Sequence, residues 1–190
     1  MSDRPLHLAL IVGSTREGRF GATVGRWFAA EARRRPDIEL EVLDLADIDL
    51  PAVHPRSATP AVDAFAERID RADAFVVVTP EYNHGYPASL KHAIDLVHDE
   101  WQAKPVGFVS YGGISGGLRA VEQLRQVFAE LHATTVRDSV VFPMVWNLFD
   151  DDGRPHEPEG CSAAAKVMLD QLAWWAAALR TARTERPYAA

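Results

Sequence analysis

The regular alternation of short apolar runs with longer amphipathic segments most constrains the fold of this chain. Nearly continuous apolar runs, typical of parallel strands buried on both faces, cover Leu6–Val12 and Ala74–Thr79, and a strand is also predicted at Val106–Ser110. Further strands are predicted at Ile38–Leu45 and Thr134–Phe142. The run from 74 to 79 is rich in β-branched residues, which predicts a central strand.

Segments with apolar residues at helical spacing separate these strands. Helices are predicted at Gly21–Arg35, at Val62–Arg71, from Pro87 onward, at Gly116–Leu131 and at Cys161–Arg180. In the last helix, burial is expected for Val167, Leu169, Leu172, Trp175 and Leu179. Strand and helix thus alternate five times, which predicts an α/β fold in which helices cover both faces of a parallel sheet, a three-layer doubly wound sandwich.

Length and charge narrow the range of functions. The 190 residues predict a single domain, 1–190, with one site. The formal charge of -7 offers no basic stripe for phosphodiesters, so nucleic acid is not an expected partner. No apolar stretch reaches the ~18 residues of a membrane span. Cys161 is the only cysteine, and the start of the chain lacks a signal-peptide pattern, so a cytoplasmic location is expected.

The loop after the first predicted strand is the first candidate site. In open α/β sheets, ligands bind beyond the carboxyl ends of the strands. The segment Gly13–Gly21 combines glycines, hydroxyl groups, Arg16, Arg19 and the start of a helix, which indicates a phosphate cradle. The alternative is a glycine-rich turn with solvated arginines. The segment matches neither the P-loop nor the dinucleotide pattern, which disfavours tightly bound NAD(P) or a P-loop nucleotide.

The loop after the third predicted strand, Thr79–Pro87, is polar and aromatic and leads into a helix that begins with proline. Tyr82 is a candidate to pack on a flat ring, and Asn83 and backbone amides are candidate donors. The alternative is a turn whose tyrosines anchor the next helix. His84 is an isolated loop histidine, and no catalytic role is assigned to it or to any other side chain.

The loop after the fourth predicted strand, Ser110–Gly117, contains four glycines, which indicates close approach of backbone to a ligand. The same loop allows a second interpretation, since residues 113–117 match the Gly-x-Ser-x-Gly nucleophile elbow of α/β-hydrolases. A triad would then join Ser115 to Asp138 or Asp150 and to His156. The histidines form no cluster and the acidic run 150–152 lacks calcium-loop spacing, so no metal is predicted.

Together, the three loops make the chain resemble the NADPH-dependent FMN reductase family, a flavodoxin-like group with quinone, azo and chromate reductases. The resemblance spans the whole chain. Its motifs are Gly13-Ser14-Thr15-Arg16-x-Gly, then Pro80-Glu81-Tyr82-Asn83 with Pro87, Leu90, Lys91, Ala93, Ile94 and Asp95, and finally Gly112-Gly113 with Gly116-Gly117-x-Arg119-Ala120. This similarity implies a flavodoxin-like five-stranded parallel sheet in the order 2-1-3-4-5.

The resemblance also implies the cofactor and its contacts. FMN would be bound, and NAD(P)H would be a transient hydride donor. The residues implied in cofactor binding are Ser14, Arg16, Arg19, Phe20 and Gly21 at the phosphate, Pro80, Glu81, Tyr82 and Asn83 along the ring and ribityl chain, and Tyr111, Gly112 and Gly113 at the polar edge of the isoalloxazine. Many relatives carry serine and asparagine in place of Arg19 and Gly21.

The activity implied is that of an FMN-dependent NAD(P)H oxidoreductase. Electrons would pass to a small acceptor: a quinone, a free flavin, an azo compound or a metal oxyanion. A homodimer or homotetramer is implied as well, with Trp101, Trp146 and Phe149 in the interface or simply in the core. The alternatives are a flavodoxin-like electron carrier, the serine hydrolase, and a binding module without cofactor.

Overall fold

The computed structural model describes residues 4–189 and contains a six-stranded parallel sheet. The strands are β1 Leu6–Val12, β2 Ile38–Asp44, β3 Ala74–Pro80, β4 Pro105–Tyr111, β5 Thr134–Thr135 and β6 Val140–Phe142. The helices are α1 Gly21–Arg33, α2 Pro60–Arg71, α3 Ala88–Asp95, α4 Leu118–Glu130 and α5 Pro158–Glu185, with short 3-10 turns at Asp99–Trp101 and Val145–Asn147. The strand order is β2-β1-β3-β4-β5, and β6 also pairs with β4, so the predicted flavodoxin-like order is confirmed.

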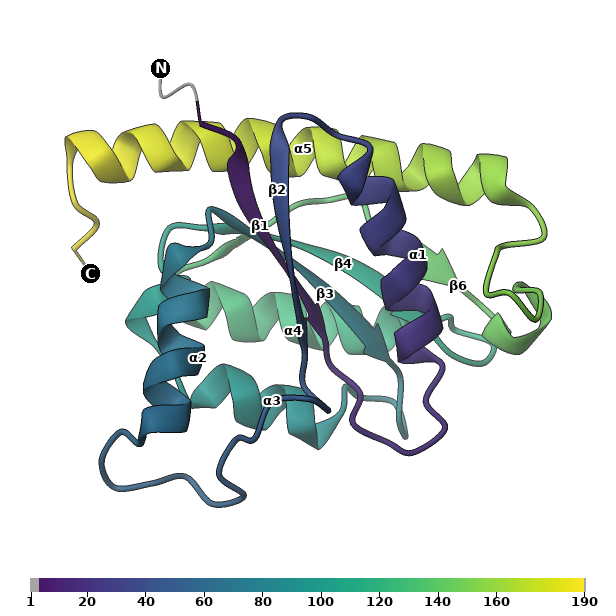
Figure 1. The fold of residues 1–190 in the computed structure, drawn as a ribbon, viewed down its shortest axis with the longest axis horizontal. Coiled ribbons are helices and arrows are strands. Elements are labelled where there is room, and N and C mark those ends of the chain that lie inside the picture. Colours follow the sequence, from purple (N-terminus) through teal and green to yellow (C-terminus); the bar gives the residue numbers. More distant parts are fainter. Residues whose placement is uncertain (1–3, 190) are drawn as a thin grey trace.

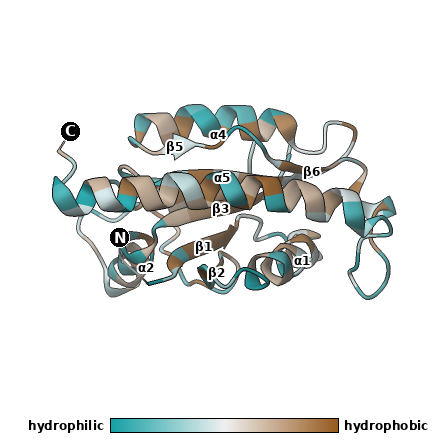
Figure 2. Cartoon of the chain, turned by 90° about the horizontal axis from the view of Figure 1, so that it is seen from above, coloured by the Kyte–Doolittle hydropathy of each residue, from teal (hydrophilic) through white to brown (hydrophobic). Residues whose placement is uncertain are grey.

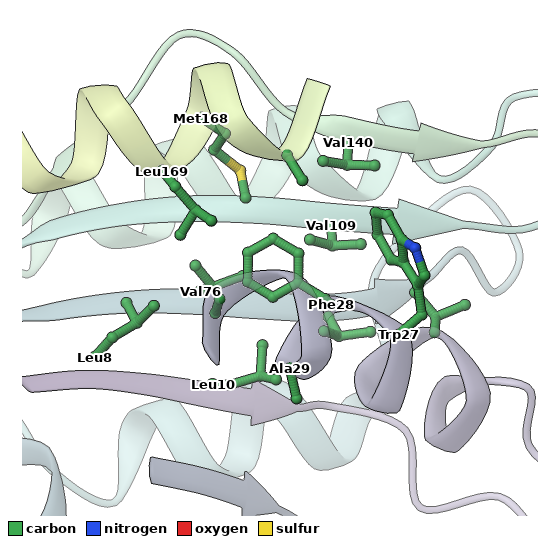
Figure 3. Packing of buried hydrophobic residues seen from close by; sticks show 14 of the residues in the cluster. Leu8, Leu10, Trp27, Phe28, Ala29, Val76, Val109, Val140, Met168 and Leu169 are labelled. Atoms are coloured by element: carbon green, nitrogen blue, oxygen red, sulfur yellow. The ribbon is translucent and has the colours of Figure 1, made fainter. Parts of the chain in front are cut away.

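Two hydrophobic clusters hold the three layers together. On one face, α1 and α5 pack on β1, β3 and β4, and Figure 3 shows Phe28 between Val76 and Leu10 with Met168 above. On the other face, α2, α3 and α4 bury a second cluster around Trp101, whose ring meets Phe75 at a centroid distance of 4.7 Å. Every residue of β1, β3 and β4 is buried, which explains why these strands read as nearly continuous apolar runs.

The predicted fifth strand is wrong as a single element. Thr134–Thr135 and Val140–Phe142 each pair with β4, but the residues 136–139 between them belong to neither strand. The guanidinium of Arg125 on α4 donates to the carbonyl oxygens of Val136 at 2.7 Å and Arg137 at 3.0 Å. These backbone groups are therefore satisfied by a side chain, and the strand divides there.

The expected burial in α5 is correct for only part of the list. Leu169 and Leu172 are buried on the sheet side, but Val167 is 48% and Trp175 40% exposed, and Leu179 is half-buried. At about 100° per residue, Val167 lies roughly opposite the buried stripe and Trp175 lies at its border. The exposed outer face of this helix is visible in Figure 2, which also shows the brown, apolar strands enclosed between the helices.

The loops that follow β1, β3 and β4 come together at the carboxyl edge of the sheet. In Figure 1 the arrowheads point toward these loops, and both ends of the chain lie on the opposite side of the molecule. Strand order reverses between β1 and β3, where neighbouring connections leave to opposite faces. No helix within 4–189 is long and apolar enough to cross a membrane.

Candidate functional site

The loop after β1 places a buried hydroxyl group at the carboxyl edge of the sheet. Ser14 has no exposed surface, and its Oγ lies 2.8 Å from the phenolic oxygen of Tyr82 in the loop after β3. The backbone N–H of Gly13 donates to Val78 at 2.9 Å, so the loop leaves β1 still attached to the neighbouring strand. The first and second predicted loops are therefore in direct contact.

The two arginines of this loop differ in their surroundings. Arg16 is exposed, whereas Arg19 is half-buried and forms an ion pair with Asp44 at 2.5 Å, at the end of β2. The Nε of Arg19 is buried and has no hydrogen-bond partner. Asp44 therefore orients the guanidinium, and Nε remains available to a ligand oxygen. Asp44 was not among the predicted site residues, because a carboxylate near a strand end gives no sign of its partner.

The amino end of α1 lies beside a buried tyrosine. Phe20 stands at the N-cap without a side-chain hydrogen bond and packs on Phe149 at a centroid distance of 5.6 Å. Gly21 follows, and a Cβ at that position would lie 2.6 Å from the phenolic oxygen of Tyr111. Only glycine allows the tyrosine to approach the helix end this closely.

Tyr111 closes β4 and is 4% exposed. Its hydroxyl is buried without a hydrogen-bond partner, and burial raises the pKa of the phenol, so the group is a neutral donor at ordinary pH. A buried hydroxyl without a partner costs about 1–3 kcal/mol. Since the neighbouring helix end offers free N–H groups, the natural partner for both is an anion or a polar ligand atom.

The loop after β3 forms a tight hairpin turn. Tyr82 and Gly85 exchange backbone hydrogen bonds of 2.8 and 3.0 Å, and Asn83 and His84 between them have φ of 49° and 76°. Positive φ at both central residues defines a type I′ turn. Pro80 is the buried last residue of β3, and Asn83 and His84 are exposed at the tip. The turn directs Tyr82 back toward Ser14.

The loop after β4 is shaped by close backbone packing. Gly112 and Gly113 pair with the segment after β6, since the carbonyl of Gly113 accepts from Met144 at 2.9 Å. Gly117 has φ of 91°, and a Cβ there would lie 2.7 Å from that of Ser110. Glycine is therefore required at this position. A Cβ at Gly113 would lie 3.8 Å from the Trp146 ring, which is 56% exposed beside the loop.

A buried carboxylate connects the second and third loops. The side chain of Glu81 is 5% exposed and forms an ion pair with Arg119 in the first turn of α4. Its Oε2 accepts from the Oγ of Ser115 at 2.7 Å and from the backbone N–H of Arg119 at 3.2 Å. Burial alone would raise the pKa of Glu81, but Arg119 and Ser115 outweigh it, and the pKa lies below its ordinary value.

This arrangement does not support a serine hydrolase. The Oγ of Ser115 donates to Glu81, and within residues 4–189 no hydrogen bond joins it to a histidine. Asp138 accepts instead from Gln171, and Asp150 accepts from the backbone of Arg154. Ser115 and both candidate aspartates of the predicted triad therefore have other partners, and the catalytic geometry is missing.

The same edge of the sheet fits FMN. In the part of the chain that the structure describes, the buried side-chain polar atoms without a partner are the Nε of Arg19, the Oγ of Ser110 and the phenolic oxygen of Tyr111. All three lie in or beside the predicted loops. They join a helix amino end, which attracts phosphate, and a glycine-rich backbone, which admits a flat ring.

Comparison with known proteins shows the family of the chain. The family model described as NADPH-dependent FMN reductase matches residues 6–147. The chain belongs to the NADPH-dependent FMN reductase family. It is 33% identical over 147 residues to an NAD(P)H-dependent FMN reductase of Schizosaccharomyces pombe, covering 72% of this chain and 73% of that protein. It is 37% identical over 141 residues to a quinone reductase of Escherichia coli K12, covering 70% and 74%.

The solved structures agree on the fold of this FMN reductase family member. The flavoenzyme FerB of Paracoccus denitrificans, an NAD(P)H:(acceptor) oxidoreductase, superposes with a TM-score of 0.74 at 22% identity, covering 90% of this chain and 97% of that one. Family membership makes the chain an FMN-dependent NAD(P)H oxidoreductase that acts on small molecules, so the predicted family, cofactor class and enzyme class are confirmed.

Two further predictions from the sequence concern the aromatic residues of a candidate interface and the absence of a metal site. Trp101 is completely buried and Phe149 is 7% exposed, so both belong to the core, whereas Trp146 is exposed. No group of three or more histidine, cysteine, aspartate or glutamate side chains among residues 4–189 is arranged to hold a metal ion.

Proposed function

We propose that FMN binds along the carboxyl edge of the sheet, as the cofactor of a single domain, with its phosphate at the amino end of α1. The observation that carries this proposal is that the buried polar atoms without a partner belong to Arg19, in the loop after β1, and to Ser110 and Tyr111, at the end of β4. The proposed binding residues are Ser14, Arg16, Arg19, Phe20, Gly21, Pro80, Glu81, Tyr82, Asn83, Tyr111, Gly112 and Gly113.

The protein binds FMN and orients it. Ser14 and Arg19 supply a hydroxyl and a guanidinium beside the N–H groups of α1, which suits a phosphate dianion. Gly112 and Gly113 present backbone with little side-chain cover, and Tyr82 supplies an aromatic wall. When bound, FMN supplies the redox chemistry, accepting a hydride from NAD(P)H and passing two electrons to the acceptor. No side chain need act as acid or base.

The acceptor class follows from an exposed apolar rim. Ile114 is 88% and Trp146 56% exposed next to the glycines of the third loop, a surface suited to flat, partly apolar molecules. We therefore favour a quinone over a metal oxyanion, with free flavins and azo compounds as further candidates. This preference is in line with the quinone reductase of Escherichia coli and a probable NADPH:quinone oxidoreductase of rice, among the related proteins.

We also propose a homodimer or homotetramer. Ile114, Leu118, Met144 and Trp146 are each more than 40% exposed, and they come from three neighbouring segments beside the flavin site. Grouped exposed apolar side chains of this size are typical of an interface. The lone Cys161 suits a reducing compartment, and we place the enzyme in the cytoplasm.

The decisive experiment is an absorption spectrum of the purified protein after FMN addition and desalting, followed by anaerobic NADPH. Retained flavin bands that bleach support the reductase, and steady-state NADPH oxidation with a quinone then tests the acceptor. Retained bands that do not bleach favour an electron carrier. Protein that retains no FMN contradicts the proposed site and favours a binding module without cofactor. The gel-filtration mass tests the dimer.

A further inference from the structure

Glu81 and Arg119 form a charged pair beside the proposed flavin site. Their carboxylate and guanidinium are in contact, although Glu81 lies in the loop after β3 and Arg119, 38 residues later, in the first turn of α4. The Glu81 side chain is 5% exposed and that of Arg119 44% exposed, so the carboxylate is enclosed while the guanidinium borders solvent. A buried carboxylate is costly unless paired, so the pair has a defined role in the fold or in function.

The contacts of Glu81 fix the start of α4. This helix has Gly117 at its N-cap, which offers no side-chain acceptor to the first N–H groups. The Oε2 of Glu81 takes that place from outside the helix, accepting from the N–H of Arg119 at 3.2 Å. A negative charge here also interacts favourably with the helix dipole. The cap therefore comes from the loop after β3.

The same carboxylate fixes the distance between the ring-binding loops. A Cβ at Gly112 would lie 3.8 Å from the Cβ of Glu81, so the two loops lie in contact. The Oγ of Ser115 donates to Glu81 at 2.7 Å and also accepts from Arg119 at 3.2 Å. Gly112 thus lies between β4 and the segment from Ser115 to Arg119, which makes three polar contacts with the side chain of Glu81.

We propose that Glu81 and Arg119 are positioning residues that hold the glycine loop of the flavin site in place and keep its local charge neutral. This inference rests on the proposed FMN site. Only the backbone of Glu81 is then left to line the proposed cofactor site, because its carboxylate contacts Ser115 and the first turn of α4. Arg119 would otherwise leave an uncompensated positive charge beside Gly112 and Gly113, where it would stabilise the state of the cofactor that carries more electrons.

Charge neutralisation predicts opposite effects from the two partners. Glu81→Gln removes the negative charge and leaves Arg119, so the midpoint potential of the bound FMN rises. Arg119→Gln leaves the carboxylate, so the potential falls when it is measured at a pH at which the unpaired Glu81 is still ionised. A shift of about 30 mV in each direction corresponds to a tenfold change in a two-electron equilibrium. A purely structural role would weaken FMN binding in both variants without this change of sign.

The test uses the FMN-loaded protein and four variants: Glu81→Gln, Arg119→Gln, the double variant and the control Glu41→Gln. Glu41 is a matched control, because Arg68 and Arg71 each donate to it at 2.7 Å on β2, outside the three loops. The dissociation constant is measured by quenching of FMN fluorescence, the potential by equilibration with a reference dye, and folding by the melting temperature of the apo-protein.

The inference is supported if the two single variants shift the potential in opposite directions, the double variant returns toward wild type, and the control does not move. Shifts in the same direction, or none beyond the control, overturn it. If Glu81→Gln does not retain FMN, the test is the midpoint potential of FMN bound to Arg119→Gln. A lowered potential supports the inference, and an unchanged one overturns it. Wild-type protein that binds no FMN contradicts the proposed function itself, which is a separate result.

Discussion

The hydroxyl of Ser14 and the phenolic oxygen of Tyr82 lie 2.8 Å apart, and this contact joins the first two loops of the site across 68 residues of sequence. Ser14 has no exposed surface, and it belongs to the loop that leads into the amino end of α1. An incoming phosphate would therefore compete with Tyr82 for the hydroxyl of Ser14.

This contact gives the first prediction. Ser14→Ala should weaken FMN binding about tenfold, since a hydrogen bond to a charged group contributes about 1.5–3 kcal/mol. Riboflavin lacks the phosphate, so its dissociation constant should not change. Fluorescence titration with both ligands makes the comparison. An equal loss for FMN and riboflavin would mean that Ser14 acts on the ring loop through Tyr82 and not on the phosphate.

Arg19 carries the second prediction. Asp44 holds one guanidinium nitrogen at 2.5 Å, and the buried Nε has no partner. Arg19→Gln should raise the dissociation constant of FMN about tenfold and reduce its dependence on salt, because one charge-assisted contact is lost. The control is Arg34→Gln, which removes an exposed arginine paired with Glu31. If Arg19→Gln binds FMN as tightly as the control, the phosphate does not use Arg19.

Gly21 gives a prediction on both stability and binding. An alanine there would place its Cβ 2.6 Å from the phenolic oxygen of Tyr111, which forces the tyrosine or the helix to move. Overpacking of this kind costs about 1–3 kcal/mol. We expect Gly21→Ala to unfold at lower urea concentration and to bind FMN more weakly.

A double variant checks the physical reason. Tyr111→Phe removes the oxygen that the new Cβ would meet, so Gly21→Ala with Tyr111→Phe should recover much of the lost free energy of unfolding. The coupling between two contacting sites is read from a double-mutant cycle. Additive losses would show that Gly21 is required for the backbone of α1 and not for the approach of Tyr111.

The sequence predicted those parts of the structure that depend on local pattern. β1, β3 and β4 were found because burial on both faces favours a nearly continuous run of apolar residues. The break between β5 and β6 was missed, since it depends on Arg125 reaching carbonyl groups more than ten residues away. A long-range contact of a single side chain leaves no periodic signal.

In the candidate site too, features set by local sequence were predicted and those set by long-range contacts were not. The loops were predicted from their glycines and from their places after apolar strands. Which way each side chain points was not predictable: Glu81 turns to Arg119, Tyr82 to Ser14, and Asp44 to Arg19. The two residues of each pair lie at least 25 positions apart in the sequence, so each partner is known only once the strand order brings their segments together.

Lys104 gives the last prediction, on the pH dependence of stability. Burial lowers the pKa of Lys104 to about 8, although its Nζ donates to the carbonyl oxygens of Ile69 at 3.0 Å and Asp70 at 2.7 Å in the last turn of α2. Above that value the folded protein releases a proton that the unfolded chain keeps up to a pH near 10.5. The unfolded state then binds more protons, so this group makes stability rise with pH between the two values.

We compare Lys104→Met with wild type and with Lys166→Met, which removes an exposed lysine. From pH 7 to pH 9 the free energy of unfolding of wild type should increase relative to Lys104→Met by on the order of 1 kcal/mol, since one pKa unit corresponds to about 1.4 kcal/mol. Other titrating groups cancel in the difference. Urea unfolding at each pH gives the measurement. A constant difference across this range would mean that Lys104 keeps its proton, held by the carbonyl groups that end α2.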